Sequence, residues 1–413
     1  MDFHLKNYQE VVKTLIYAEA ETSTKNNSEV SASAQPQGSC KSDFLLQHGI
    51  DELKIAMSEE NVKDVYDKLL SVPQGKYCVL YGCGTFGKAI CHEMFKININ
   101  VDFFCESDGG LNVGKTVNGI KCLSFTELNE IRDDVVVFIS HGNARETYDF
   151  LLKHGFNDVR YAPITFQIIH YEIIKNIRFS DIEDDLMRLL EIFEDEHSAV
   201  VMLKLFVSWF KGNIVPDHLL HKYDPHQYFP KDIVTLSNNE FFVDAGAFNG
   251  DSVKSFINHA PKGNHTIYSF ELDKANYDQL LKNTGDMPGV VAYNLGLSDS
   301  EGEIEYSSDG QNSNISTNKG TGSVAKLAKL DDILADKPVT FIKMDIEGAE
   351  LDALHGAEQI IRKQKPVCAI CVYHNPMHFL QVPLLLKQYV PEYKIYFRQH
   401  TETMLEAVCY ATL

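Results

Sequence analysis

Two segments of the sequence share one local pattern, a short apolar run that ends in a glycine-rich turn and continues as a helical stretch. The first is CVLYGCGTFG at 78–87 and the second is FFVDAGAFNGD at 241–251. A strand that turns sharply into a crossover helix needs such a turn, because glycine adopts backbone angles that other residues avoid. The pattern therefore predicts two α/β domains in one chain.

The length of 413 residues exceeds the usual size of a single hydrophobic core, which also favours two domains. With 44% hydrophobic and 23% charged residues, the composition is that of a globular protein. The 58 acidic and 38 basic side chains give a formal charge of −20, which would repel nucleic acid phosphates and anionic lipids. We therefore expect neither a nucleic acid nor a membrane as partner.

The sequence also indicates in which cellular compartment the protein is expected. MDFHLKNYQE at the start lacks the basic and apolar regions of an export signal, and nowhere do eighteen uncharged apolar residues follow one another. The nine cysteines show no spacing typical of a disulfide framework. Cys368 and Cys371 lie three apart in a strand-like run, where they would point to opposite faces, so we interpret them as core residues. We expect a cytoplasmic protein.

Four parts can be distinguished along the chain. Residues 1–75 have helical patches and a polar stretch at 21–39 that we expect to be mobile. Residues 76–162 alternate strand with helix, as in a Rossmann-like domain. Residues 163–237 have apolar positions at helical spacing and predict a helical connector, whose run AVVMLKLFVSWF is apolar enough to be buried against a domain or a partner chain. A homodimer is therefore an open alternative.

The part from 238 to 413 alternates strand with helix again. Helices are predicted between the first five strands and before the sixth, and the residues between the last two strands are too few for a helix. Five alternating units closed by a hairpin are typical of the seven-stranded class I methyltransferase sheet rather than of a purely parallel dinucleotide fold. The predicted strands are FFVDAG, TIYSFE, VVAYN, VTFIKMD, VCAICVYH, YKIYFRQ and EAVCYA.

The turn VDAGAFNGD predicts a nucleotide-type cofactor. Asp244 ends the strand, Gly246 and Gly250 allow a ligand close to the backbone, and Asp251 starts a helix. Glu271 ends the next strand, where a carboxylate can accept both hydroxyls of a ribose. A dinucleotide would need a third glycine where Phe248 stands, and the acidic side chains would repel its pyrophosphate. The same acidic side chains can face the ammonium group of a methionine.

A second polar group follows the fourth and fifth strands of this domain. FIKMDIEGAE predicts Lys343, Asp345 and Glu347 at one strand tip, and VCAICVYHNP brings Tyr373 and His374 to the next tip. The ordinary histidine pKa near 6.5 favours His374 as the base that removes an acceptor proton. Alternatively, the two carboxylates and His374 hold a divalent metal ion that lowers the pKa of the acceptor hydroxyl. We favour the metal-free arrangement.

With these motifs in order, the C-terminal half resembles the FkbM-type methyltransferase family. The resemblance runs from VDAGAFNGD through FELDKANYDQLLKN, NLGLSDSEGEIEY, KLDDIL and IKMDIEGAELDALHGA to VYHNP, YKIYFRQH and VCYA. It implies a class I fold, S-adenosylmethionine as cofactor, and transfer to a hydroxyl of a sugar, glycan or secondary metabolite.

The resemblance also implies roles for residues. Asp244, Gly246 and Gly250 would contact the methionine end of the cofactor, Glu271 the ribose, and residues 294–298 would border the adenine. Lys343, Asp345, Glu347 and His374 form the implied catalytic group. The implied cofactor set is Asp244, Gly246, Ala247, Phe248, Gly250, Asp251, Glu271, Leu272, Asn294, Leu297 and Ser298.

Residues 309–323, DGQNSNISTNKGTGS, lack apolar side chains, and we expect them to form a mobile flap that sets acceptor specificity or, equally, a surface excursion without contact to substrate.

The first glycine-rich turn offers a second possible nucleotide site. Gly82, Gly84 and Gly87 follow an apolar strand, and Glu106 ends the next one. This arrangement resembles the small nucleotide-binding domains beside sugar-modifying enzymes. A nicotinamide-dependent oxidoreductase, a nucleotide-sugar-binding protein and a degenerate scaffold are the alternatives. His141 and Asn143, after a later strand, are further candidate ligand contacts.

Overall fold

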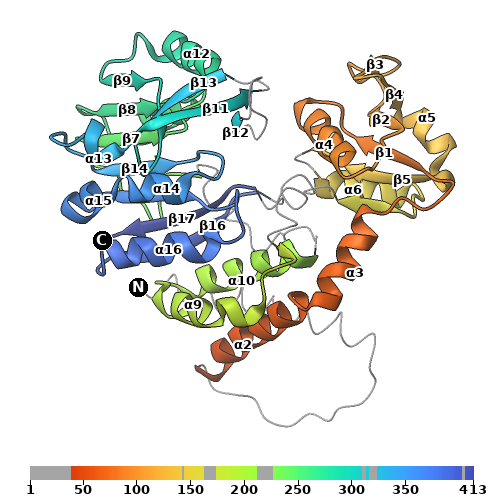
Figure 1. Cartoon of the computed structure of the whole chain (residues 1–413), viewed down its shortest axis with the longest axis horizontal. Coiled ribbons are helices and arrows are strands. Elements are labelled where there is room, and N and C mark those ends of the chain that lie inside the picture. Colours follow the sequence, from red (N-terminus) through yellow and green to blue (C-terminus); the bar gives the residue numbers. More distant parts are fainter. Residues whose placement is uncertain are drawn as a thin grey trace.

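The computed structural model describes residues 39–141, 144–161, 174–211, 227–308, 313–315, 323–401 and 405–413. Figure 1 shows two α/β lobes, each built around one sheet, with helices between them. The two Rossmann-like domains expected from the sequence are therefore present. Nearly all of the polar stretch at 21–39 lies outside the described residues, as does most of the flap expected at 309–323.

The first lobe is a six-stranded sheet in the order β3-β4-β2-β1-β5-β6, parallel except for the β3-β4 hairpin. The buried runs CVLY and VVVFI form its central strands, and separate apolar clusters cover its two faces. Its elements are β1 (Tyr77–Tyr81), α4 (Thr85–Lys96), β2 (Phe103–Glu106), β3 (Thr116–Val117), β4 (Ile120–Ser124), α5 (Phe125–Glu130), the 3₁₀ turn Arg132–Asp134, β5 (Val135–Ile139), α6 (Ala144–Lys153) and β6 (Val159–Tyr161).

The second lobe is a seven-stranded sheet in the order β16-β17-β15-β14-β7-β8-β9. Five neighbouring strands pair in parallel, and the hairpin of β16 and β17 closes the sheet beside β15, as the sequence predicts. Of the seven strands, only β17 runs in the opposite direction. Its strands and helices are β7 (Phe241–Ala245), α11 (Asp251–His259), β8 (Thr266–Phe270), α12 (Lys274–Thr284), β9 (Val290–Tyr293), β14 (Phe341–Met344), α14 (Glu350–His355), α15 (Glu358–Gln364), β15 (Val367–Cys371), α16 (His378–Tyr389), β16 (Lys394–Gln399) and β17 (Ala407–Thr412).

The connection between β9 and β14 differs from the sequence prediction, which places a crossover helix there. A four-stranded sheet in the order β10-β13-β11-β12 takes most of this length. In its strand GEIEY, acidic and apolar side chains alternate in the sequence, as is typical of an extended strand. Only a four-residue helix follows. These elements are β10 (Gly296–Leu297), β11 (Gly302–Ser308), β12 (Ser313–Ile315), β13 (Ser323–Ala328) and α13 (Leu330–Ile333).

The remaining helices lie under the second lobe, except that Glu59–Leu70 runs from there toward the first lobe (Figure 1). They are α2 (Ser39–Ala56), α3 (Glu59–Leu70), α9 (Phe179–Ile192) and α10 (Glu196–Lys211). The run that the sequence predicts to be buried is α10, which lies between α2 and β16 with Trp209 fully enclosed. One continuous apolar core joins α2, α9 and α10 to the seven-stranded sheet. Within the described stretches, no helix combines the length and the apolarity needed to cross a membrane.

Candidate active site

The four central strands of the seven-stranded sheet end along one edge. β8, β7, β14 and β15 are consecutive parallel neighbours. Because the carboxyl ends of parallel strands lie at the same edge, the residues that finish or follow them become neighbours. This edge brings Glu271, Gly246, Asp345 and His374 together from distant parts of the sequence.

The turn from β7 into α11 runs close to the neighbouring strand. Gly246 has φ +75°, and a Cβ atom there would lie 1.9 Å from the backbone oxygen of Asp345. The backbone N–H groups of Gly246 and Ala247 both donate to the carbonyl of Phe270 at 3.0 Å. Gly250, with φ +86°, caps the N-terminus of α11. Gly246 is therefore also required by close backbone packing, and Gly250 is favoured by its left-handed backbone conformation.

Glu271 lies at the tip of β8 with its carboxylate turned toward this turn. Oε2 accepts the backbone N–H of Phe248 and Oε1 accepts that of Asp273, both at 2.8 Å. Burial of the side chain raises the pKa of Glu271 to about 7 and outweighs the two N–H donors, which favour the charged form. The carboxylate is thus fixed, little hydrated and close to its protonation midpoint at neutral pH.

The other residues of the predicted cofactor set lie around Glu271 to different degrees. Asn294 Nδ2 donates to the backbone oxygens of Glu271 at 2.8 Å and Leu272 at 3.0 Å, which fixes the end of β8. Leu297 is buried in β10, and Ser298 donates its N–H to Ala328. Asp251 is exposed at the start of α11, where its carboxylate accepts the backbone N–H of Ser252.

Asp244 does not have the position expected of a direct ligand contact. Its side chain is fully buried, and Oδ1 lies 3.1 Å from Nζ of Lys343 on the neighbouring strand. Burial raises the pKa of Asp244 to about 6 although Lys343 favours the charged form. Burial acts to lower the pKa of Lys343, but Asp244 and Asp345 outweigh it and raise that pKa. The two side chains form a charged pair inside the sheet.

Lys343 is therefore not the acceptor-facing group that the sequence predicts. Its Nζ also donates to the backbone oxygens of Ala245 at 3.1 Å and Gly246 at 2.7 Å, and it lies 5.2 Å from the ring centre of Tyr228. Because Lys343 stands within β14 rather than after it, its side chain points across the sheet to Asp244. It holds the end of β7 in place.

Asp345, the first residue after β14, accepts two tyrosine hydroxyls. Tyr228 donates to Oδ2 at 2.9 Å, and Tyr373 donates to Oδ1 at 3.0 Å. The Asp345 side chain remains 23% exposed, so the carboxylate is fixed yet still open on one side. Such a group can accept a further hydrogen bond from a bound molecule.

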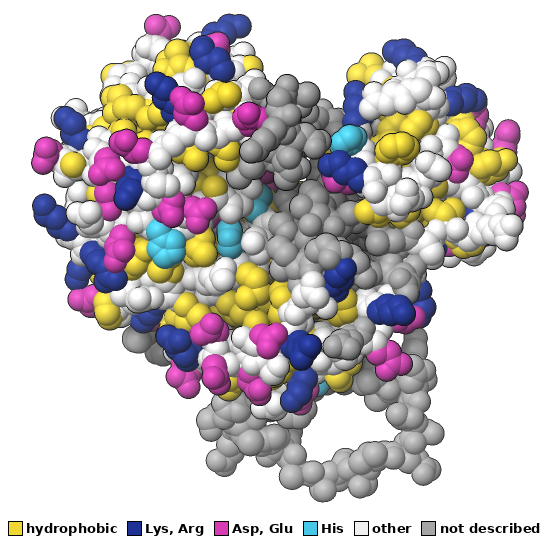
Figure 2. Space-filling model, viewed as in Figure 1, with side chains coloured by type: hydrophobic (Ala, Val, Ile, Leu, Met, Phe, Trp, Pro, Cys, Tyr) yellow, Lys and Arg dark blue, Asp and Glu magenta, His cyan; other side chains and the backbone are white. Residues whose placement is uncertain are grey.

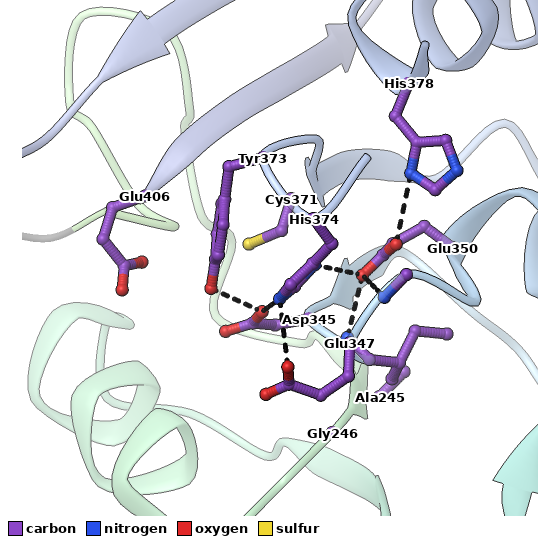
Figure 3. A network of polar contacts seen from close by, with 12 residues as sticks. Ala245, Gly246, Asp345, Glu347, Glu350, Cys371, Tyr373, His374, His378 and Glu406 are labelled. Atoms are coloured by element: carbon purple, nitrogen blue, oxygen red, sulfur yellow. Dashed lines mark hydrogen bonds and ion pairs between the residues drawn. The ribbon is translucent and has the colours of Figure 1, made fainter. Parts of the chain in front are cut away.

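A buried chain of two histidines and one carboxylate lies behind Asp345 (Figure 3). His374 Nδ1 lies 2.8 Å from Oε1 of Glu350, and His378 Nδ1 lies 3.3 Å from Oε2. Burial acts to raise the pKa of Glu350, but His374 and His378 outweigh it and hold that pKa well below its usual range. The backbone N–H of Ile346 donates to the same carboxylate at 3.0 Å. Glu350 is thus a fixed negative charge that orients His374.

Glu347 completes the acidic edge. It has φ +57°, an uncommon backbone conformation for a side chain with a Cβ atom, and Gly348 follows with φ +102°. Its side chain is 33% exposed, and Oε2 lies 3.7 Å from His374 Nε2. Two carboxylates therefore flank the outer nitrogen of one imidazole ring, as Figure 3 shows.

This arrangement coincides with a family match in the sequence. Residues 244–397 match the sequence model of the Methyltransferase FkbM domain, and the segment contains the β7 turn, Glu271, the Asp345–Glu350 group and His374. The matched residues form an FkbM methyltransferase domain within the second lobe. The resemblance predicted from the sequence is confirmed.

Similar proteins support the fold of the FkbM domain and of the chain around it. The crystal structure of Methyltransferase FkbM from Methylobacillus flagellatus KT superimposes with a TM-score of 0.65 at 20% identity, over 90% of this chain and 99% of that one. The redox-sensing transcriptional repressor Rex 2 of Enterococcus faecalis (strain ATCC 700802 / V583) is 30% identical over 108 residues, which are 24% of this chain. The chain matches about half the length of that repressor, 50%.

Within the FkbM domain, the neighbours of His374 change the pKa on which its predicted role as general base depends. Burial acts to lower its pKa, but Glu350, then Glu347 and Asp345, outweigh burial and raise it to about 10. The surrounding carboxylates therefore favour the doubly protonated ring, which must lose a proton before Nε2 can accept one. The sequence prediction uses the pKa of an isolated histidine, and the role of His374 as base stays a prediction.

Four residues that contribute to this part of the FkbM domain lie outside the predicted site. Tyr228 comes from the connector, 117 positions before its partner Asp345, and no local pattern marks it. Glu406 precedes β17, and burial together with Asp345 raises its pKa to about 7. Glu350 and His378 follow Glu347 and His374 at helical spacing, which is a signal that the sequence does offer.

The glycine-rich turn of the first lobe is packed mainly against itself. A Cβ atom at Gly87 would lie 2.1 Å from the Gly82 oxygen, whereas one at Gly84 would meet nothing within 4 Å. Both carboxylate oxygens of Glu106 accept N–H groups of Asn112, at 2.9 and 2.7 Å, and so close their own loop. His141 Nε2 lies 3.0 Å from the Thr147 hydroxyl, and Asn143 lies outside the described residues.

Proposed function

We propose that the protein is an S-adenosylmethionine-dependent O-methyltransferase that acts on a hydroxyl of a sugar, a glycan or another small metabolite. The observation that carries the proposal is the buried carboxylate of Glu271, fixed by two backbone N–H groups beside the β7 turn. The FkbM domain supports methyl transfer as the reaction class. The bound donor supplies an electrophilic methyl group on a sulfonium sulfur.

The residues around Glu271 fit the nucleoside half of this donor. A carboxylate offers about four acceptor positions, and two of those on Glu271 hold the N–H groups of Phe248 and Asp273. The remaining positions suit the two hydroxyls of a ribose. Leu272, which lies against Gly296, offers an apolar neighbour for adenine at the end of β8. Asp244 and Lys343 support the turn from inside instead of contacting the donor.

The acceptor belongs at the edge formed by Asp345 and Glu347. Both carboxylates are partly exposed, so each can accept a hydrogen bond from an acceptor hydroxyl. During transfer the hydroxyl oxygen forms a bond to the methyl carbon, and the electron pair of the broken carbon–sulfur bond stays on sulfur. The hydroxyl proton passes through one of these carboxylates to water. Holding the acceptor oxygen in line with the methyl group is the main contribution of the protein.

The distribution of charged side chains on the surface supports an uncharged acceptor that bears hydroxyl groups. Figure 2 shows acidic and basic side chains interspersed over the coloured part of the visible face, without an extended basic patch among the described residues. This distribution, with the net charge of −20, supports a sugar or metabolite better than a nucleic acid.

Calorimetry and product analysis test the proposal. We expect one S-adenosylmethionine to bind per chain, and we expect methyl label to pass from it to an oxygen of at least one member of a panel of sugars, nucleotide sugars and oligosaccharides. Mass spectrometry with fragmentation locates the new methyl group. A protein that gives no binding heat contradicts the donor assignment, and a product methylated on nitrogen or carbon contradicts O-methyl transfer.

For the first lobe we infer binding of a nucleotide or nucleotide sugar as a second candidate function. The observation that favours it is the strand order, because Gly82 ends β1 where the direction of the sheet connections reverses, the usual ligand position in such sheets. Titration with reduced nicotinamide dinucleotide and with a nucleotide sugar tests it. Gly84→Val is the variant to compare, since it adds bulk toward open space. If the wild-type protein binds neither ligand, the first lobe does not have this role.

A further inference from the structure

At the acidic edge, the outer nitrogen of His374 lies close to two carboxylate oxygens. His374 Nε2 lies 3.5 Å from Asp345 Oδ1 and 3.7 Å from Glu347 Oε2. Hydrogen bonds from nitrogen to oxygen have lengths of about 2.7 to 3.2 Å. Neighbouring ligands that each lie about 2.1 Å from one octahedral metal ion are about 3.0 Å apart. The two gaps are therefore too long for direct hydrogen bonds, and each would have to close by less than about 1 Å for its atoms to bind one shared ion.

The orientation of the His374 ring is also that of a metal ligand. Its inner nitrogen is held at 2.8 Å by Glu350, a fully buried carboxylate that is itself fixed by the backbone N–H of Ile346 and by His378. Metal-binding imidazoles usually have such a carboxylate on the nitrogen that faces away from the ion. Glu350 thus directs Nε2 toward Asp345 and Glu347.

Asp345, Glu350 and His374 offer ligand atoms that all lie within 4.8 Å of one another. Of the two glutamates nearby, Glu347 is the better ligand candidate, because Glu350 is enclosed and already accepts N–H groups. Glu347 is 33% exposed, so its side chain can turn to shorten the gap. Its backbone is left-handed, with φ +57°, which is uncommon for a residue with a Cβ atom.

We propose that Asp345, Glu347 and His374 bind one divalent cation of the Mg²⁺ or Mn²⁺ class. Two carboxylate oxygens and one imidazole nitrogen suit such ions and leave coordination positions free on the exposed side. The ion would displace the proton from Nε2 of His374, because imidazole binds metals in its neutral form. The inference rests on the proposed methyl transfer: an ion there would polarise the acceptor hydroxyl and lower its pKa. The released proton then passes to water, and the methyl group and the carbon–sulfur electron pair move as described above.

Mn²⁺ titration of the full chain, followed by the electron paramagnetic resonance signal of free Mn²⁺, tests the site. We expect one bound Mn²⁺ per wild-type chain. Glu347→Gln, which preserves size at a partly exposed position, should weaken binding at least about tenfold. Glu303→Gln on β11, an exposed carboxylate, is the matched control and should bind like the wild type. Glu350→Gln should weaken binding about 10- to 100-fold through the ring orientation.

The outcomes separate this inference from the proposed function. Wild-type protein that binds no Mn²⁺ at millimolar concentration, or Glu347→Gln that binds it unchanged, overturns the metal site. The same samples are titrated with S-adenosylmethionine. If the protein binds S-adenosylmethionine but not Mn²⁺, the metal site is overturned and the proposed function stands. If it binds Mn²⁺ but not S-adenosylmethionine, the proposed function is overturned and the metal site stands. Native Trp209 fluorescence, from the only tryptophan of the chain, confirms that each variant is folded.

Discussion

Lys343 Nζ lies 3.1 Å from Asp244 Oδ1, and both side chains are shut off from solvent at the centre of the seven-stranded sheet. Removing one partner of such a pair leaves a buried charge without compensation. Lys343→Met should therefore lower the free energy of unfolding by about 3 kcal/mol, measured in urea by Trp209 fluorescence. Adding Asp244→Asn should restore part of the loss. Arg188→Ala, which breaks an exposed pair with Asp185, is the control and should cost less than about 1 kcal/mol.

The raised pKa of Glu271 predicts a pH dependence of donor binding. Ribose hydroxyls donate to the ionised carboxylate, so binding favours the form that predominates above the pKa of about 7. Affinity for S-adenosylmethionine should rise about tenfold from pH 6 to pH 8, measured by calorimetry. Glu271→Gln should bind about tenfold more weakly at pH 8 and lose this dependence. A variant that keeps the wild-type pH profile would show that another group titrates.

The close approach of Gly246 to Asp345 predicts a steric requirement. A Cβ atom there would lie 1.9 Å from a backbone oxygen, and φ is +75°. Gly246→Ala should lower the free energy of unfolding by about 2 kcal/mol or more and weaken donor binding. Gly302→Ala is the control, because a Cβ atom at Gly302 meets nothing within 4 Å. Equal melting temperatures for the two variants would refute the requirement.

Glu347 should show opposite effects on stability and activity. Glu347→Gly allows the left-handed backbone without a Cβ atom, so stability should stay equal or rise by up to about 1 kcal/mol. Methyl transfer should fall at least about tenfold because a carboxylate is lost at the acceptor edge. Lys365→Gly changes a residue with φ +49° at the end of α15 and should leave transfer unchanged. Full activity in Glu347→Gly would remove this residue from the site.

A pH effect is also expected where α2 meets α10. Burial acts to raise the pKa of Glu52, but Lys204 and Lys211, both 2.8 Å away, outweigh it and lower the pKa to about 2. The stabilisation is present above the ordinary pKa of 4.5 and is lost as the pH falls through 2. Glu52→Gln should cost about 2 kcal/mol at pH 7 and progressively less below pH 4.5. A constant difference from wild type across that range would contradict this.

The order of the strands along the chain could be predicted from the sequence, since each strand is an apolar run bounded by turn residues. The sheet inserted after β9 could not be predicted as easily, because GEIEY and SVAKLA are short and lie beside a polar stretch. GEIEY alternates acidic and apolar side chains, which is a signal for a strand, whereas SVAKLA does not alternate. The helix expected there has only the four residues of α13.

The candidate site was partly predictable for a physical reason. Glu271, Asp345 and His374 each follow or end a strand, and strand ends meet at one edge. The register of β14 against β7, which pairs Lys343 with Asp244, depends on the folded sheet and cannot be obtained from either segment alone. The protonation of His374 depends on Glu350 in the same way. The positions of the site residues could therefore be predicted from the sequence, whereas their charge states depend on neighbours that only the folded structure reveals.

The apolar core that joins α2, α9 and α10 to the seven-stranded sheet has a consequence for how the chain is divided. In sequence, α2 and α3 precede the first lobe, and α9 and α10 follow it. The first lobe is therefore an insertion within the helical layer that supports the second, and the smallest unit able to bury this core is discontinuous. The matched segment 244–397 is only the central part of that unit.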